Sequence, residues 1–155
     1  TEVYRISNQP KKASESAHRT IALLSGTKED ATSSQHGHYA DKELALAYLE
    51  VYDYTNALKH ALIEYNRRPD NIDVEQTIAW VYYKLGQYNK ANDFISQAIR
   101  TNSQNPVLLF QAGLIKKKVG DRSGGSVLIK RALETNPFIS PLLQWEVEPV
   151  FAYNR

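Results

Sequence analysis

The sequence of 155 residues contains no cysteine and no methionine. Without cysteine the chain forms no disulfide bond and has no thiolate to act as a nucleophile or metal ligand. The chain also lacks a large excess of positive or negative charge, because it has 19 lysines and arginines and 17 aspartates and glutamates. The resulting net charge of +2 gives no basis for nucleic-acid binding. No apolar run approaches the roughly 18–20 residues that cross a bilayer, so we expect no membrane insertion.

Motifs for catalysis and for cofactor binding are missing too. Gly124-Gly125 lacks the lysine and the spacing of a phosphate-binding loop, and no Gly-x-Ser-x-Gly nucleophile motif occurs. His36 and His38 lie two residues apart in a polar stretch without a convincing third metal ligand. We therefore predict a protein that is not an enzyme and that binds no cofactor and no metal ion.

What the sequence does contain is an internal repeat with a period of 34 residues. A fixed period of this length is the signature of a stacked repeat array. We define the repeats as residues 38–71, 72–105 and 106–139, preceded by residues 1–37 and followed by residues 140–155. Residues that coincide after a shift of one period include Tyr48 with Tyr82, Ala57 with Ala91, Gly86 with Gly120, and Ala98 with Ala132.

Within each repeat, apolar residues recur at helical spacing on both sides of a turn. In the second repeat, Ile78, Val81 and Leu85 lie on one face of a helix with 3.6 residues per turn. Gly86 follows, where glycine supplies the positive φ that ends a helix. Small residues such as Ala91 then recur where a second helix approaches the first. The pattern predicts two amphipathic helices joined by a short turn in every repeat.

Several residues occupy the same position in different repeats, and together they form a known motif. They are the tyrosines Tyr48 and Tyr82, the Gly-x-Tyr-x-x-Ala motif of residues 86–91, and the closing prolines Pro69 and Pro137. The chain therefore resembles the tetratricopeptide repeat family over about two-thirds of its length. The resemblance implies an all-α protein, a right-handed α-α superhelix of three helix-turn-helix repeats with a flanking helix at each end.

The chain departs from the family pattern at two turns. The first repeat has Tyr52 where glycine is usual, and the third has Gly124-Gly125 where its second helix begins. Glycine inside a helix costs about 1 kcal/mol relative to alanine. We therefore expect the third repeat to be the loosest of the three.

Both flanks of the array carry weaker helical patterns. A helix is predicted from Pro10 to Ser25, with Gly26 ending it and residues 27–37 forming a loop. This helix is either the remnant of an eroded repeat, cut from a longer protein, or an N-terminal cap on the first repeat. After the third repeat, residues 140–147 are predicted to form a capping helix that Pro149 ends, with an aromatic tail beyond it.

In the tetratricopeptide family the first helix of each repeat lines a concave binding face. The resemblance therefore implies a groove with an apolar and aromatic centre and a charged edge, typical of a site for an amphipathic helix or an extended peptide. In the alternative, Trp80 and Phe110 only pack against neighbouring helices. The predicted groove residues are Tyr39, Lys42, Leu46, Leu49, Asp73, Gln76, Trp80, Tyr83, Lys84, Phe110, Gln111, Leu114 and Lys117.

The groove lacks one specialised function of the family. Members that clamp the C-terminal carboxylate of chaperone tails use five lysine, asparagine and arginine positions, of which only Lys42 matches here. We therefore predict a protein-interaction module or scaffold that binds another protein or peptide segment. The alternatives are a module that assembles into a homo-oligomer and the regulatory repeat arm of a larger protein.

Overall fold

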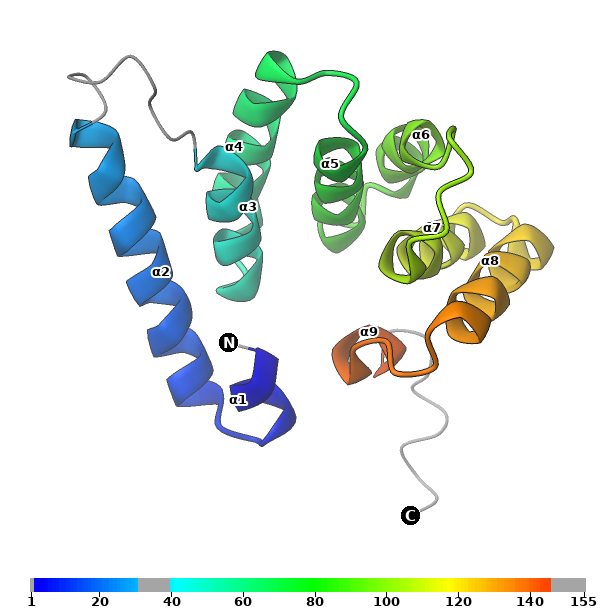
Figure 1. Cartoon of the computed structure of the whole chain (residues 1–155), viewed down its shortest axis with the longest axis horizontal. Helices are drawn as coiled ribbons and strands as arrows, with labels where there is room; N and C mark the ends of the chain where they lie inside the picture. The colour runs from blue at the N-terminus through cyan, green and yellow to red at the C-terminus, as the bar shows by residue number, and fades with distance from the viewer. Residues whose placement is uncertain (1, 31–39, 146–155) are drawn as a thin grey trace.

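The computed structural model describes residues 2–30 and 40–145 of the chain (Figure 1). This part of the chain is built from α-helices joined by short turns, without a strand. The helices are α1 (Glu2–Ile6), α2 (Pro10–Asp30), α3 (Asp41–Glu50), α4 (Tyr54–Arg67), α5 (Ile72–Lys84), α6 (Tyr88–Ala98), α7 (Pro106–Lys118), α8 (Arg122–Thr135) and α9 (Pro141–Trp145).

Three consecutive helix pairs, α3–α4, α5–α6 and α7–α8, stack into an arc (Figure 1). The first helices of the pairs contact one another in turn, α3 with α5 and α5 with α7, and form the inner layer. At the N-terminal end α2 packs against α3, and at the other end α9 follows α8. The prediction of an all-α superhelix of three helix-turn-helix units with flanking helices is confirmed.

The turns within the three pairs share one backbone conformation. Gly86 and Gly120 have φ angles of 71° and 97°, and Tyr52 has a φ of 62° at the corresponding place in the first pair. Glycine adopts this left-handed conformation freely, whereas holding a tyrosine there costs about 1–2 kcal/mol. The common φ shows that the turns are equivalent even where the glycine is replaced.

Side-chain caps define where the paired helices begin. Asn71 and Asn105 each accept hydrogen bonds from two backbone N–H groups at the starts of α5 and α7. Asp53 and Asp121 each accept one such bond at the starts of α4 and α8. These bonds satisfy amide groups that the first turn of a helix otherwise leaves without a partner.

A continuous apolar core runs between the helix pairs. Large side chains such as Ile78, Phe110 and Ile115 are fully buried and belong to one cluster. The second helices of the pairs contribute small side chains, which let these helices approach the inner layer closely. These buried alanines are Ala57, Ala61, Ala91, Ala98 and Ala132.

In the third pair, the backbones of α7 and α8 lie close together at two glycines. A Cβ atom added to Gly113 of α7 would lie 2.6 Å from the carbonyl oxygen of Gly125 of α8. A Cβ added to Gly125 would lie 2.5 Å from the carbonyl oxygen of Gly113. The expectation of a loose third repeat rested on helix propensity alone and stays a prediction, but Gly125 also permits close packing against Gly113, which helix propensity does not include.

The N-terminal flank differs from its predicted form. Residues 2–6 form the short helix α1, and α2 continues to Asp30, past Gly26, where the sequence predicted its end. Gly26 does not adopt the positive φ that ends a helix. Ala13 and Ala17 of α2 are buried, and α2 packs against α3 and α1. The remainder of the predicted loop, residues 31–37, lies outside the described residues.

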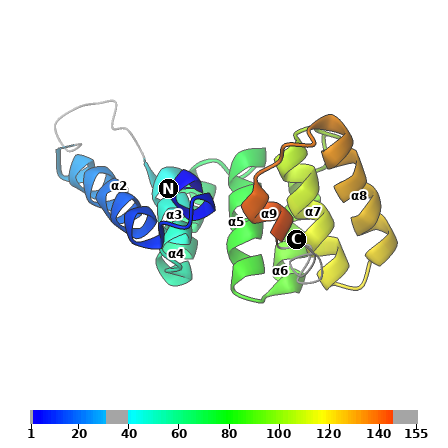
Figure 2. The same cartoon turned by 90° about the horizontal axis from the view of Figure 1, so that it is seen from below.

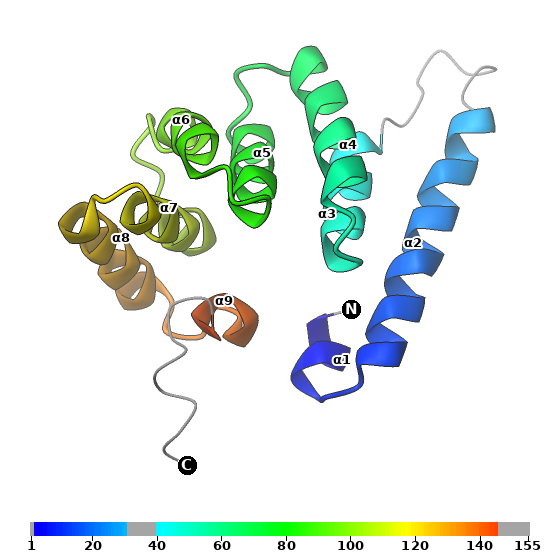
Figure 3. The same ribbon diagram turned by 180° about the vertical axis from the view of Figure 1, so that it is seen from behind.

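The two ends of the described chain lie next to each other. Figure 2, a view from below, shows α1 beside α9, and the two helices are in contact. Figure 3 shows from behind that they lie on the open side of the arc. The predicted capping helix is present as α9, and its predicted continuation beyond Trp145 lies outside the described residues.

Candidate functional site

The inner layer encloses a groove with a volume of about 940 Å³, at the upper end of the range for ligand sites in proteins. Its walls come from three parts of the chain. The inner helices α3, α5 and α7 form one side, α1 and α2 form the N-terminal end, and α9 forms the C-terminal end. The groove is therefore bounded by the flanking helices as well as by the repeats.

Apolar side chains form the floor of this groove. Leu46 and Leu49 come from α3, Trp80 from α5, and Leu142 and Leu143 from α9. Leu46 is 42% exposed, although it lies within a concave surface. Apolar area of this kind is favourable to cover with a ligand, because covering it releases it from water.

The ring of Trp80 is held by its neighbours on α5. It stacks on Tyr83 with a centroid separation of 4.7 Å and an interplanar angle of 6°. The ammonium group of Lys84 lies 4.9 Å from the centre of the indole, within the range of a cation–π contact. These contacts fix the orientation of Trp80, so the ring offers a pre-organised apolar surface to the groove.

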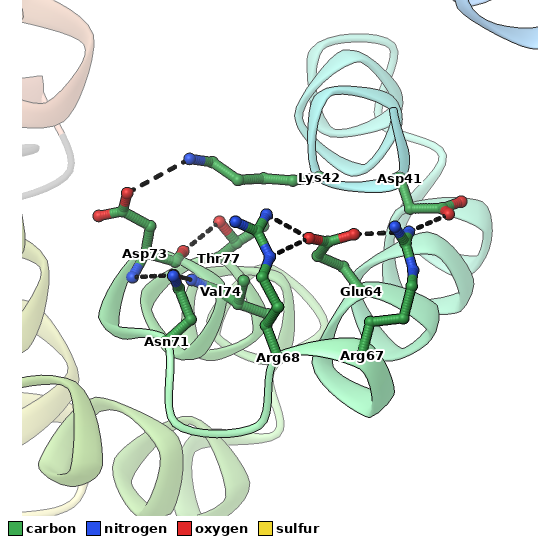
Figure 4. A network of polar contacts seen from close by, with 9 residues as sticks. All are labelled: Asp41, Lys42, Glu64, Arg67, Arg68, Asn71, Asp73, Val74 and Thr77. Carbon is green, nitrogen blue, oxygen red and sulfur yellow. Dashed lines mark hydrogen bonds and ion pairs between the residues drawn. The ribbon is translucent and has the colours of Figure 1, made fainter. Parts of the chain in front are cut away.

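Two polar contacts connect the inner helices. Lys42 of α3 forms an ion pair of 3.4 Å with Asp73 of α5 (Figure 4). The side-chain amide of Gln76 of α5 donates a hydrogen bond of 2.9 Å to the amide oxygen of Gln111 of α7. Each contact joins one helix pair to the next.

A second polar network lies between α3 and α4. Arg67 forms ion pairs with two buried carboxylates, 2.5 Å from Asp41 and 2.6 Å from Glu64 (Figure 4). His60 contacts Asp41 at 2.8 Å, and Arg68 contacts Glu64. Burying a carboxylate requires such partners, because an isolated buried charge is strongly unfavourable. The network therefore has a structural explanation.

Charged groups at the groove are mainly acidic. Glu2 of α1 and Glu43 and Glu50 of α3 line it, against Arg5 of α1 and Lys84 of α5. The guanidinium of Arg5 lies 3.4 Å from the carboxylate of Glu50 and is thereby neutralised. Glu43 is exposed and forms no ion pair with the residues that the structure describes.

The structure brings some of the predicted groove residues together and places others elsewhere. Leu46, Leu49, Trp80, Lys84 and Gln111 line the groove, and Lys42, Asp73 and Gln76 form the contacts between the inner helices. Tyr39 lies outside the described residues. The remaining predicted residues, which do not line the groove, are Tyr83, Phe110, Leu114 and Lys117.

The inner helix α7 explains most of this difference. Phe110 is only 1% exposed, and every residue of α7 from Leu108 to Ile115 is buried. This helix is in contact with α5, α6 and α8, so little of its surface remains for the groove. For Phe110 the alternative of packing against neighbouring helices is the observed one. Lys117 faces a separate concavity of about 430 Å³ next to α8.

Sequence reasoning missed the contributions of the flanking helices. Glu2 and Arg5 of α1 and Leu142 and Leu143 of α9 line the groove, but neither flank follows the 34-residue period. The apolar residues near both ends were the available signal. Their place at the groove depends on the curvature of the whole arc, which local periodicity does not report.

The described residues give no sign of a metal centre or a membrane span. Across residues 2–30 and 40–145, no group of three or more histidines and carboxylates could hold a metal ion. In the same ranges, no helix has both the length and the apolar character that a membrane crossing requires.

The sequence matches no protein-family model and no curated protein. Solved structures with a similar fold include "MamA MSR-1 C2", 18% identical with a TM-score of 0.61, covering 88% of this chain and 77% of that chain. "MamA AMB-1 P212121" is 20% identical with a TM-score of 0.56, covering 81% and 67%. "Crystal structure of MamA" is 21% identical with a TM-score of 0.54, covering 86% and 72%. At these identities the likeness establishes a shared helical superhelix, in line with the tetratricopeptide-like architecture.

Proposed function

We propose that this chain is a non-catalytic protein-interaction module that binds a segment of a partner protein in the concave groove. The observation that carries the proposal is the exposed apolar floor of the groove. Leu46 and the pre-organised ring of Trp80 lie in a concavity of about 940 Å³. Concave sites with rigid aromatic anchors are the usual setting for tight protein contacts.

The charges of the groove indicate which segment fits. The carboxylates of Glu2, Glu43 and Glu50 outnumber the positive groups of Arg5 and Lys84. Since Arg5 already pairs with Glu50, a ligand gains most by presenting its own positive charge toward Glu43. We infer a segment with apolar side chains next to a lysine or arginine, because complementary charge favours association and specificity.

Selection from a random displayed peptide library tests this proposal. Peptides enriched on the wild-type chain are expected to combine apolar residues with lysine or arginine. The variant Leu46→Ser should weaken their binding roughly tenfold or more, as loss of an interface anchor does. Val127→Ser is the matched control, because Val127 is an exposed apolar residue of α8, outside the groove. Peptides that bind both variants equally would place the binding surface elsewhere.

Self-assembly through the groove is the outcome that would replace this proposal. In a Trp145→Phe background, the fluorescence of Trp80 reports whether its ring is covered. Blue-shifted emission that turns red on dilution would show that another copy covers the groove. The molar mass of the Leu46→Ser variant, measured by light scattering, then distinguishes the two functions. An assembly held through the groove would dissociate in this variant, while the Val127→Ser control stays assembled.

A further inference from the structure

The two ends of the described chain meet across the open side of the groove. α1 is in contact with α9 (Figure 2). The hydroxyl of Ser140 donates a hydrogen bond to the carboxylate of Glu2, 138 residues away. Both sides of this contact also line the groove, Glu2 and Arg5 from α1 and Leu142 and Leu143 from α9. The contact therefore lies at the mouth of the proposed binding site.

α1 is fastened firmly to one side of the opening. The guanidinium of Arg5 forms the ion pair with Glu50 and donates hydrogen bonds to the Glu50 carbonyl and, at 3.0 Å, to the hydroxyl of Tyr52. It also lies 4.7 Å from the centre of the Tyr52 ring. These contacts attach α1 to the end of α3 and to the side chain of Tyr52.

α9 is fastened to the other side in a different way. The side chain of Ile139, just before α9, is buried, and Leu143 packs against the apolar core. Among the described residues, the bond between Ser140 and Glu2 is the one hydrogen bond that connects α1 to the segment at the start of α9. α1 and α9 are thus each held firmly to the rest of the protein, whereas one hydrogen bond connects them to each other. We call this contact between α1 and α9 the clasp.

We propose that the contact between α1 and α9 is a clasp that closes the groove and controls access to Trp80. This inference rests on the proposed function of the groove, whose entry it regulates. In the closed form, α1 and α9 cover the side of the groove opposite the inner helices. The hydrogen bond between Ser140 and Glu2 is exposed, so breaking it costs little free energy and the closed and open forms interconvert readily.

The chemistry of the clasp makes it sensitive to charge at Ser140. A hydroxyl donates to the carboxylate of Glu2 and holds the ends together. A second negative group at this position, such as a phosphate or a carboxylate, has no proton to donate and repels Glu2. Added negative charge at Ser140 therefore opens the groove, and a positive charge at Glu2 restores the attraction.

Distance measurement between spin labels tests the clasp directly. Val3→Cys and Phe138→Cys provide label sites that are 75% and 88% exposed, in a chain without other cysteines. The labelled parent should give one narrow distance distribution at low ionic strength, where exposed charges are least screened. Ser140→Glu should shift it to longer distances, and the double variant Glu2→Lys with Ser140→Glu should restore it. Ser123→Glu on α8 is the charge control.

Access to the groove is measured separately, by acrylamide quenching of Trp80 in the Trp145→Phe background. Quenching should increase severalfold with Ser140→Glu and return to the parent value with the charge-swapped pair. Unchanged distances in Ser140→Glu, or no rescue by the pair, would overturn the clasp. Changed distances with unchanged quenching would overturn its control of the groove. Both readouts work without a ligand, so they stand apart from the peptide selection that tests the proposed function.

Discussion

The first two helix pairs and the last pair of the array are held together in different ways. Within the first two pairs, the contacts include the buried carboxylates of Asp41, Glu64 and Glu75, each paired with arginine. Between α7 and α8 the contact is apolar and close, with the backbones of Gly113 and Gly125 against each other. One repeat architecture thus accommodates both a polar and an apolar junction.

The difference indicates how salt, acid and substitutions should change the stability of each junction. Buried ion pairs add little net stability over apolar packing, but losing one partner leaves an uncompensated charge and costs several kcal/mol. Close packing of backbones has no charged component. It fails when a side chain is added, and it should be indifferent to salt and acid. We therefore call the Arg-paired contacts the polar junction and the Gly113–Gly125 contact the glycine junction.

The largest effect is expected at the polar junction from Arg100→Ala. Arg100, in the turn after α6, forms an ion pair with Glu75, which is 1% exposed, and donates a hydrogen bond to the carbonyl of Asp70 at 2.6 Å. Removing it leaves the Glu75 carboxylate buried without its partner, at a cost of about 3 kcal/mol. Urea denaturation measures the loss in free energy of unfolding.

Two further variants sharpen the interpretation of that loss. Glu75→Gln added to Arg100→Ala should recover part of the stability, because a neutral amide is less costly to bury than a carboxylate. Arg100→Lys keeps the positive charge and should lose less than Arg100→Ala. A loss below about 1 kcal/mol in Arg100→Ala would put the pair among ordinary surface ion pairs, and the contrast between the junctions would disappear.

A smaller effect is expected at the glycine junction from Gly125→Ala. The new Cβ would lie 2.5 Å from the carbonyl oxygen of Gly113, so the helices must move apart. Overpacking of this kind costs about 1–3 kcal/mol, and the better helix propensity of alanine returns up to about 1 kcal/mol. Urea denaturation should show a net loss that is the same at low and high salt, unlike the loss of Arg100→Ala.

Gly26→Ala is the matched control for this substitution. Gly26 also lies in a helix, but a Cβ there would meet no atom within 4 Å. Alanine should therefore leave stability unchanged or raise it slightly. If Gly125→Ala behaved like Gly26→Ala, the close approach of α7 and α8 would carry no energetic weight.

The contact between Gly113 and Gly125 also shows how far the sequence could predict the fold. The 34-residue period predicted paired helices, and the turns at Gly86 and Gly120 have the left-handed φ that glycine suggested. Helix propensity, however, judged Gly125 only as a weak helix former. Its value lies in a contact with Gly113 across two helices, which no single-helix scale includes.

The candidate site was predictable only in part for a similar reason. Leu46 and Trp80 line the groove from α3 and α5, as the resemblance to the tetratricopeptide family implied. Phe110 holds a similar place on α7, but contacts with three helices leave that helix buried. Arg5 and Leu142 reach the groove through the curvature of the arc, which brings sequence ends together that no local pattern relates.

The smallest effect is expected from Asp53→Asn and concerns acid. Asp53 caps α4, where the side-chain amide of Asn56 and then its backbone N–H hold the pKa of the carboxyl below its usual value of 3.8. A lowered pKa in the folded state stabilises the protein above pH 3.8, and this contribution is lost as the pH falls below it. Asn accepts the same backbone bond without charge, so the stability deficit of Asp53→Asn should be present at neutral pH and shrink in acid.

Urea denaturation at several pH values measures this deficit in the free energy of unfolding, with Gly125→Ala as the reference whose deficit should not follow the same pH dependence. A deficit in Asp53→Asn that stays constant into acid would show that its charge contributes nothing.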